Sequence, residues 1–266
     1  MEQALIEKLK ILADKYEKPE FISGDPSFFL WHYADKPNAE TAAFIASALS
    51  FGSRKQFLPK IEIILNIADN SGGINEWLKS GAFRKDFIPC GADECDKFYR
   101  FYSYKDLCSL FCTLQNILCN SGSLEACVKA RYQQNPEKNI IDILSEIFDG
   151  CAIVPKGKTS AKKRLCMFAR WMVRTNSCVD RGFWHWYPKE KLIIPLDVHV
   201  LDESIKLGLI PPDAKATRKT AELLTEELKQ IWQDDPVKGD FALFGLGVSS
   251  QEELRIQTYC TNSSKL

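Results

Sequence analysis

Apolar residues in this chain recur at the spacing of an α-helix in one segment after another, and almost nowhere at the spacing of a β-strand. One helix is predicted to start at Ser103, which together with Asp106 resembles a capping box. Asn38 is predicted to cap an earlier one. Only residues 192–196 look extended, and one short, isolated segment is too little for a sheet. An all-α fold is therefore predicted, with helices over residues 1–18, 39–50, 56–68, 103–118, 140–148, 160–174, 197–207 and 217–232, and others beginning near 124 and 236.

The size and composition of the chain fit a cytoplasmic protein. It has 266 residues, of which 45% are apolar, enough for one large domain or two small ones that share a cleft. No apolar run approaches the roughly 20 residues that a membrane span needs, so we expect no membrane contact. The cysteines lie mostly in apolar helical patterns, and no pair has the C-x-x-C spacing of common zinc sites. We expect reduced thiols, no metal and no cofactor.

Charge is balanced overall but not locally. Lys and Arg together equal Asp and Glu at 35 each, yet no acidic residue lies between Asp149 and Asp180. A basic run of this kind predicts an anionic partner, phosphate being a common one, although a solvated helix face is the simpler alternative. The basic residues of this run are Lys156, Lys158, Lys162, Lys163, Arg164, Arg170 and Arg174.

The basic run enters its predicted helix through a short turn, Gly157 to Ser160. Such an entry directs backbone N–H groups toward an anion. Lys162 and Lys163 then fall in the first helical turn, where the helix dipole disfavours a cation and lowers the pKa of a lysine. An amine with a lowered pKa is suited to act as a nucleophile.

Asp197 is the second candidate for chemistry. It follows an apolar, proline-containing approach, in the segment LIIPLDVHV, and stands at the start of a predicted helix. Because Asp is a favoured N-cap, a purely structural role is an alternative that this segment alone leaves open.

Taken together, the two segments resemble the helix-hairpin-helix DNA glycosylase superfamily. In that superfamily a hairpin carries a catalytic lysine, and a Val-Asp-x-His or similar segment carries a catalytic aspartate. TSAKKRLCMFARWM here resembles the second helix of the hairpin, LDVHV resembles the aspartate segment, and ETAAFIASALSFGSRKQ resembles an early helix and polar turn. More narrowly, KKRLCMFARWMVR, LIIPLDVHV and DPVKGDFALFGLGV are typical of an uncharacterised bacterial family related to these glycosylases.

The chain departs from the superfamily pattern at several points. Thr159 and Ala161 align with the two glycines of the hairpin, and the lysine and the aspartate are 34 residues apart. The segment GFWHWYPKEK, residues 182–191, resembles an insertion found in some glycosylases that act on oxidised guanine. The iron–sulfur cysteine cluster that many relatives carry after the aspartate is absent, because Cys260 is the only cysteine in that region.

The resemblance implies a helix-hairpin-helix glycosylase-like fold with two helical subdomains and a cleft between them. One subdomain would be residues 41–196, and the other would combine 1–40 with 197–266. The implied activity is base excision from damaged double-stranded DNA, with an oxidised purine favoured and abasic-site lyase activity possible, by a protein expected to be a monomer. A catalytically inactive module that binds nucleic acid or protein is one alternative, and an enzyme that uses Asp197 on another substrate without a lysine is a second.

Each candidate residue has an expected role in this scheme. Lys163 would be the nucleophile and Asp197 its carboxylate partner, with Lys158 and Lys162 as alternative nucleophiles. The residues expected to contact DNA are Lys156, Lys158, Thr159, Ser160, Lys162, Arg164 and His199, and the expected walls of a pocket for a flipped base are Phe183, Trp184 and Trp186.

Overall fold

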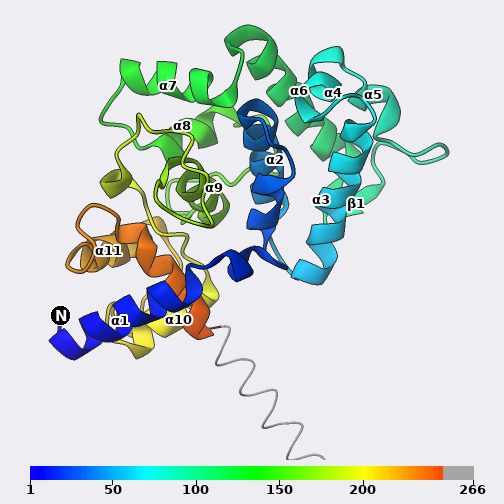
Figure 1. The fold of residues 1–266 in the computed structure, drawn as a ribbon. Coiled ribbons are helices and arrows are strands. Elements are labelled where there is room, and N and C mark those ends of the chain that lie inside the picture. The colour runs from blue at the N-terminus through cyan, green and yellow to red at the C-terminus, as the bar shows by residue number, and fades with distance from the viewer. Residues whose placement is uncertain (248–266) are drawn as a thin grey trace, which may run out of the picture.

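The computed structural model describes residues 1–247 and is built almost entirely of helices (Figure 1). The α-helices are α1 (Gln3–Tyr16), α2 (Lys36–Leu49), α3 (Arg54–Asp69), α4 (Ile74–Ser80), α5 (Phe83–Asp86), α6 (Tyr104–Ser121), α7 (Leu124–Gln134), α8 (Ile140–Ile147), α9 (Lys163–Val173), α10 (Val198–Lys206) and α11 (Arg218–Lys229). Residues 239–247 are also helical. The short 3₁₀ helices are η1 (Pro19–Ile22), η2 (Pro26–Trp31), η3 (Lys189–Lys191) and η4 (Pro236–Lys238). The predicted all-α class is confirmed.

Local capping explains where two of these helices begin. The capping box at Ser103 is present as predicted, with Asp106 and Ser103 bonding each other's backbone N–H groups. Helix α2 begins earlier than predicted, because Asp35 rather than Asn38 is its N-cap and accepts a bond of 2.9 Å from the Asn38 N–H. The Asn38 side chain instead accepts a bond of 2.9 Å from the N–H of Asn75 and so ties the start of α4 to α2.

Short elements between the long helices carry too little periodicity to be predicted. Strands β1 (Lys97–Tyr99) and β2 (Tyr102–Ser103) form a small antiparallel hairpin ahead of α6. Residues 192–196, which look extended in sequence, lie buried but form no strand. The N–H of Ile194 there donates to the Thr225 hydroxyl at 3.1 Å, so a side chain replaces the missing strand partner.

Helices α2 and α9 pack against each other at the centre of the fold. Every residue of α2 from 39 to 49 is buried, and so is every residue of α9 from 165 to 173. Phe44 of α2 stacks on Phe148 with ring centroids 4.3 Å apart and meets Phe168 of α9 edge-on at 5.0 Å. Burial of both helices fixes the position of the residue at the start of α9, which is Lys163.

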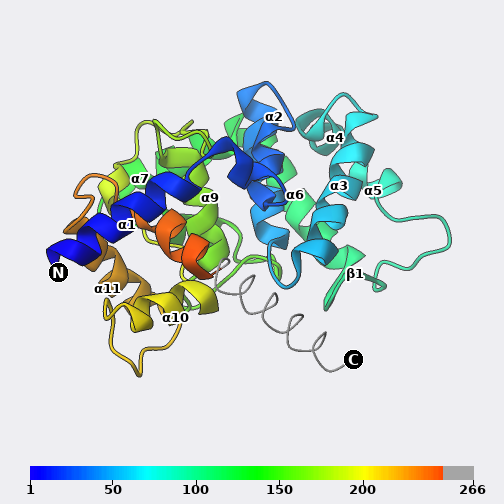
Figure 2. The ribbon, with the colours of Figure 1, turned by 60° about the horizontal axis from the view of Figure 1, so that its bottom comes forward.

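Helix α1 lies beside α10 and α11, far from it in sequence, in both ribbon views (Figures 1 and 2). Lys238 pairs with Asp14 of α1 at 2.9 Å, and the N-terminal ammonium donates to Gln230 at 3.1 Å. The proposed division into 41–196 and 1–40 with 197–266 stays a prediction, and a boundary at 41 would fall inside α2.

The cysteines of the described residues are all free thiols. Cys260 lies outside the described residues. Within residues 1–247 no helix is long and apolar enough to cross a membrane. In the same range, no group of three or more His, Cys, Asp or Glu side chains is arranged to hold a metal ion.

Candidate active site

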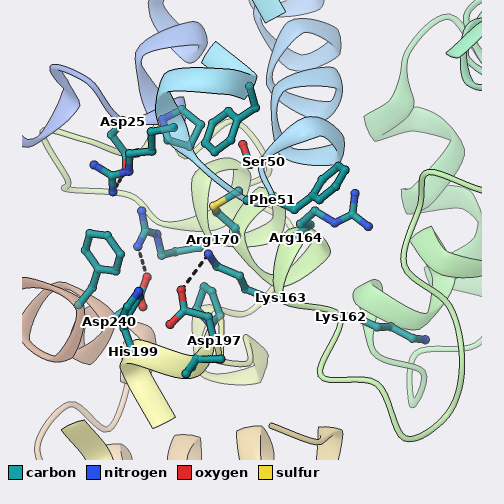
Figure 3. Close-up of a pocket in the computed structure, with 18 of the residues that line it drawn as sticks. Asp25, Ser50, Phe51, Lys162, Lys163, Arg164, Arg170, Asp197, His199 and Asp240 are labelled. Carbon is teal, nitrogen blue, oxygen red and sulfur yellow. Dashed lines mark hydrogen bonds and ion pairs between the residues drawn. The ribbon is translucent and has the colours of Figure 1, made fainter. Parts of the chain in front are cut away.

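A cavity of about 720 Å³ opens where the start of α9 meets the start of α10 and the helix of residues 239–247 (Figure 3). Its volume lies within the range of natural small-molecule sites. Apolar and aromatic side chains share the wall with charged ones. The aromatic residues are Phe21, Phe51, Phe57 and Phe244, and the ionisable residues are Asp25, Arg54, Lys162, Lys163, Arg164, Arg170, Asp197, His199 and Asp240.

Lys163 and Asp197 meet directly in this cavity (Figure 3). Lys163 Nζ lies 2.9 Å from Asp197 Oδ2, and the side chains are 34% and 19% exposed, so both remain accessible to a ligand. Asp197 also caps α10, because its Oδ1 accepts a bond of 2.9 Å from the Val200 N–H. One carboxylate therefore serves as an N-cap through one oxygen and as the partner of a lysine through the other.

The pKa of Asp197 is lowered. Burial acts to raise this pKa, but the Lys163 ammonium, the Val200 N–H and the charge of His199 together lower it by more. Asp197 is consequently ionised at neutral pH and pairs with the amine beside it.

Lys162 occupies a different environment from its neighbour. It is the residue just before α9 and adopts a left-handed backbone conformation, with a φ of 48°. Its Nζ pairs with Asp142 of α8 at 2.8 Å, and its side chain is only 8% exposed. Figure 3 shows this side chain pointing away from the Lys163–Asp197 pair. The structure thus brings Lys163, and not Lys162, to the aspartate. Lys158 lies in the exposed loop before α9.

The loop before α9 has ordinary backbone conformations at Thr159 and Ala161, the two positions that align with the glycines of the superfamily pattern. Among the described residues, positive φ angles outside glycine occur at Arg100, Lys162 and Asn176, and therefore not at Thr159 or Ala161. The Thr159 carbonyl accepts a bond of 2.9 Å from the Arg218 N–H. The loop is thereby fastened to the start of α11.

Most of the basic run is paired with carboxylates, so little of it is left as an open positive surface. Lys156 lies 3.8 Å from Asp149, Lys162 and Lys163 have the partners described above, and Arg170 and Arg174 are both buried. Asp149 and Asp180 flank the run, and its other carboxylate partners come from distant parts of the sequence, so a count restricted to residues 150–179 misses all of them.

Arg164 is also held by the protein. Its guanidinium donates to the Ala48 carbonyl at the end of α2 and lies 4.9 Å from the ring centroid of Phe51. Burial lowers the pKa of Arg164. The exposed residues among those expected to contact DNA are Lys156, Lys158, Thr159 and His199, whereas Ser160 is half-buried and pairs with Thr217. His199 lines the cavity.

Arg170 and Arg174 form a buried ionic network that joins three segments of the chain. Arg174 Nη1 contacts Asp180 at 2.6 Å and Glu17 at 2.9 Å, and its Nε contacts Asp235 at 2.9 Å. Arg170 contacts Asp180 at 3.3 Å and also pairs with Asp240. This network, Glu17 with Arg170, Arg174, Asp180, Asp235 and Asp240, fixes the 239–247 helix against α9.

Asp240 is a cavity residue that sequence analysis missed. Only 7% of it is exposed. Burial raises the pKa of Asp240 to about 6, with Arg170 and Lys163 acting to lower it and Asp197 acting to raise it. One sequence signal was available. Asp240 precedes Phe244 by four residues and so shares a helix face with it, which places an acidic group on an otherwise apolar face.

The structure does not bring the predicted base-pocket residues Phe183, Trp184 and Trp186 to the cavity. Trp184 is fully buried and donates to Glu40 at 2.7 Å, and Trp186 donates to Glu125 at 3.1 Å. The segment folds back onto α2 and α7 because these indole N–H groups find carboxylates there. The aromatic walls of the cavity come instead from Phe21, Phe51, Phe57 and Phe244, which are dispersed in sequence.

Comparison with known proteins identifies a family for this chain. No curated protein and no solved structure matches the chain. A family model described as "Protein of unknown function (DUF2400)" matches residues 25–249, a range that contains Lys163, Asp197 and Asp240. Because the match covers most of the chain, the protein belongs to the DUF2400 family.

Proposed function

We propose that this protein is a DNA base-excision glycosylase with abasic-site lyase activity, in which Lys163 is the nucleophile and Asp197 its proton acceptor. The observation that carries the proposal is the 2.9 Å contact between Lys163 Nζ and Asp197 Oδ2 on the wall of the cavity. An amine and a carboxylate at hydrogen-bond distance are the pair that nucleophilic attack by lysine requires. The helix-hairpin-helix resemblance of the same two segments supports it.

The proposed chemistry begins with transfer of one proton from the Lys163 ammonium to Asp197. The neutral amine forms a bond to the anomeric carbon C1′ as the glycosidic C–N bond breaks, and the electron pair of that bond leaves with the base, which takes up a proton. The lysine nitrogen then passes a proton to the ring oxygen as the C1′–O4′ bond breaks. The product is an iminium ion between Lys163 and the sugar, which borohydride reduces to a stable covalent adduct.

The walls of the cavity suit a flipped base. Such pockets hold a base by stacking it between aromatic or apolar side chains. Phe21, Phe51 and Phe244 line the cavity and could stack on a base in this way. Phe51 also lies beneath the Arg164 guanidinium at 4.9 Å, so this part of the wall combines an aromatic ring with a cation. An oxidised purine is the substrate class that the family resemblance favours.

The test is covalent trapping with borohydride on a panel of DNA duplexes that carry an abasic site or a common lesion, oxidised purines included. We expect the native protein to form an adduct and Lys163→Gln to form none while still binding DNA. Asp197→Asn should slow base excision by about two to four orders of magnitude, the usual scale for loss of an acid–base group.

Lys162→Gln is the matched control, because that lysine is adjacent in sequence but faces Asp142. It should retain trapping once its folding has been verified by thermal unfolding. Trapping that survives Lys163→Gln would refute the assignment of the nucleophile, and native protein that forms no adduct with any duplex would refute the proposed activity.

A further inference from the structure

The cavity contains a buried carboxyl group, Asp240, which the reaction as described above does not use. Asp240 reaches the cavity from the 239–247 helix, whereas Asp197 reaches it from the start of α10 (Figure 3). The two carboxyl groups have different cationic partners, Arg170 for Asp240 and Lys163 for Asp197. Asp25, the third carboxyl group of the cavity, pairs with Arg54 at 3.0 Å, so Asp197 and Asp240 are the two that stand beside the start of α9 in distinct environments.

The surroundings of Asp240 favour a proton on one carboxyl of the buried network. Two guanidinium groups, of Arg170 and Arg174, face four carboxyl groups. Asp180 contacts both arginines and shares Arg170 with Asp240. The other ionisable groups on the same cavity are Asp25, Arg54, Lys162, Lys163, Arg164, Asp197 and His199. With fewer cations than carboxyl groups in a water-poor region, full ionisation leaves uncompensated negative charge.

The pKa values of Asp240 and Asp197 move in opposite directions. The pKa of Asp240 is raised to about 6, chiefly by burial. The pKa of Asp197 is lowered, because the combined effect of Lys163, the Val200 N–H and His199 outweighs that of burial. Two carboxyl groups whose environments separate their pKa values in this way are suited to opposite roles, one as acid and one as base.

We propose that Asp240 is the general acid that protonates the departing base, a role that rests on the proposed glycosylase function. In this step the carboxyl proton of Asp240 passes to the base as the C1′–N bond breaks and its electron pair leaves with the base. The Asp240 carboxylate that results is stabilised by the Arg170 guanidinium, which already contacts Oδ2. Solvent returns the proton before the next turnover, and Asp197 keeps its separate task of accepting the proton of Lys163.

The decisive comparison uses two DNA substrates. A duplex that carries a base lesion needs a proton for the departing base, whereas a duplex with a preformed abasic site has no base to release. We expect Asp240→Asn to slow single-turnover excision by about two to four orders of magnitude and to leave borohydride trapping on the abasic duplex unchanged. Asn has nearly the shape of Asp and retains an oxygen acceptor for Arg170, so the network is disturbed as little as possible.

A second measurement needs no variant. The native excision rate should fall as pH rises through about 6, approaching tenfold per pH unit above it, because the acid is then increasingly ionised. The rate of borohydride trapping on the abasic duplex should not decrease in this pH range.

Unchanged excision by Asp240→Asn, or a native excision rate that does not fall above pH 6, would overturn the role of Asp240 alone. Equal losses on both duplexes would also overturn it, because a merely structural disturbance acts on both. Native protein that forms no adduct on either duplex would overturn the glycosylase proposal, and the acid role with it.

Discussion

Replacing Arg174 by Met should destabilise the protein strongly, because three carboxylates lose a shared cation. The Arg174 side chain is 2% exposed and contacts Glu17, Asp180 and Asp235 at 2.6 to 2.9 Å. Removing one partner of a buried ion pair costs about 3–5 kcal/mol, because the other charge is left uncompensated. Domains are stable by only about 5–15 kcal/mol, so the variant should lose a large fraction of the total.

Urea unfolding followed by tryptophan fluorescence measures this loss. With a slope of about 3 kcal/mol per molar urea, a loss of about 4 kcal/mol lowers the midpoint by more than 1 M. The deficit should be larger at pH 8 than at pH 5. In the variant, protonation relieves uncompensated negative charge in the folded state, so the folded state binds protons more tightly than the unfolded chain does.

Arg131→Met is the matched control, because Arg131 is exposed on α7 and should change the unfolding free energy by less than about 0.5 kcal/mol. A loss for Arg174→Met below about 1 kcal/mol, equal at both pH values, would show that the network contributes no more than surface pairs do and would refute the argument.

Further predictions concern stability and DNA binding. Glu40→Ala should cost at least about 3 kcal/mol in chemical unfolding, because the N–H groups of Trp184, Leu124 and Glu125 lose a buried acceptor at about 1–3 kcal/mol each. The stability contribution of Asp240 is present below its unfolded pKa near 3.8 and lost as pH rises through about 6, so unfolding measured from pH 4 to 7 should increasingly favour Asp240→Asn over the native protein. Charge removal at Lys158 should reduce the salt dependence of DNA binding by up to about one unit of slope, and an unchanged slope would assign that residue to the solvated surface.

Sequence periodicity was sufficient to predict the long helices, and local chemistry was sufficient for some of their ends. Ser103 was correctly identified because a capping box is read within four residues. The start of α2 was misplaced because Asp35, Lys36 and Pro37 also form a valid helix start. Only the bond that the Asn38 side chain accepts from the Asn75 N–H shows that Asn38 has another role.

The candidate site was predictable only in part. The meeting of Lys163 and Asp197 follows from the family resemblance, since no local pattern joins residues 34 positions apart. Asp240 and its partner Arg170 are 70 residues apart, and the contact depends on how the last described helix packs. The aromatic segment near Trp184 was misassigned because its composition suits a ligand pocket and a core equally well. Its position in the core depends on the hydrogen bond from Trp184 to Glu40, which lies on a helix distant in sequence.

The buried arginines of α9 also constrain the order in which the chain can fold during synthesis. Arg174 is made 61 residues before Asp235, and Arg170 is made 70 residues before Asp240. Until those acids leave the ribosome, burying α9 would place guanidinium groups in the core with only part of their counter-charge. An mRNA that stops short of residue 235 should therefore yield a chain that quality-control proteases degrade, and not a stable, shortened protein.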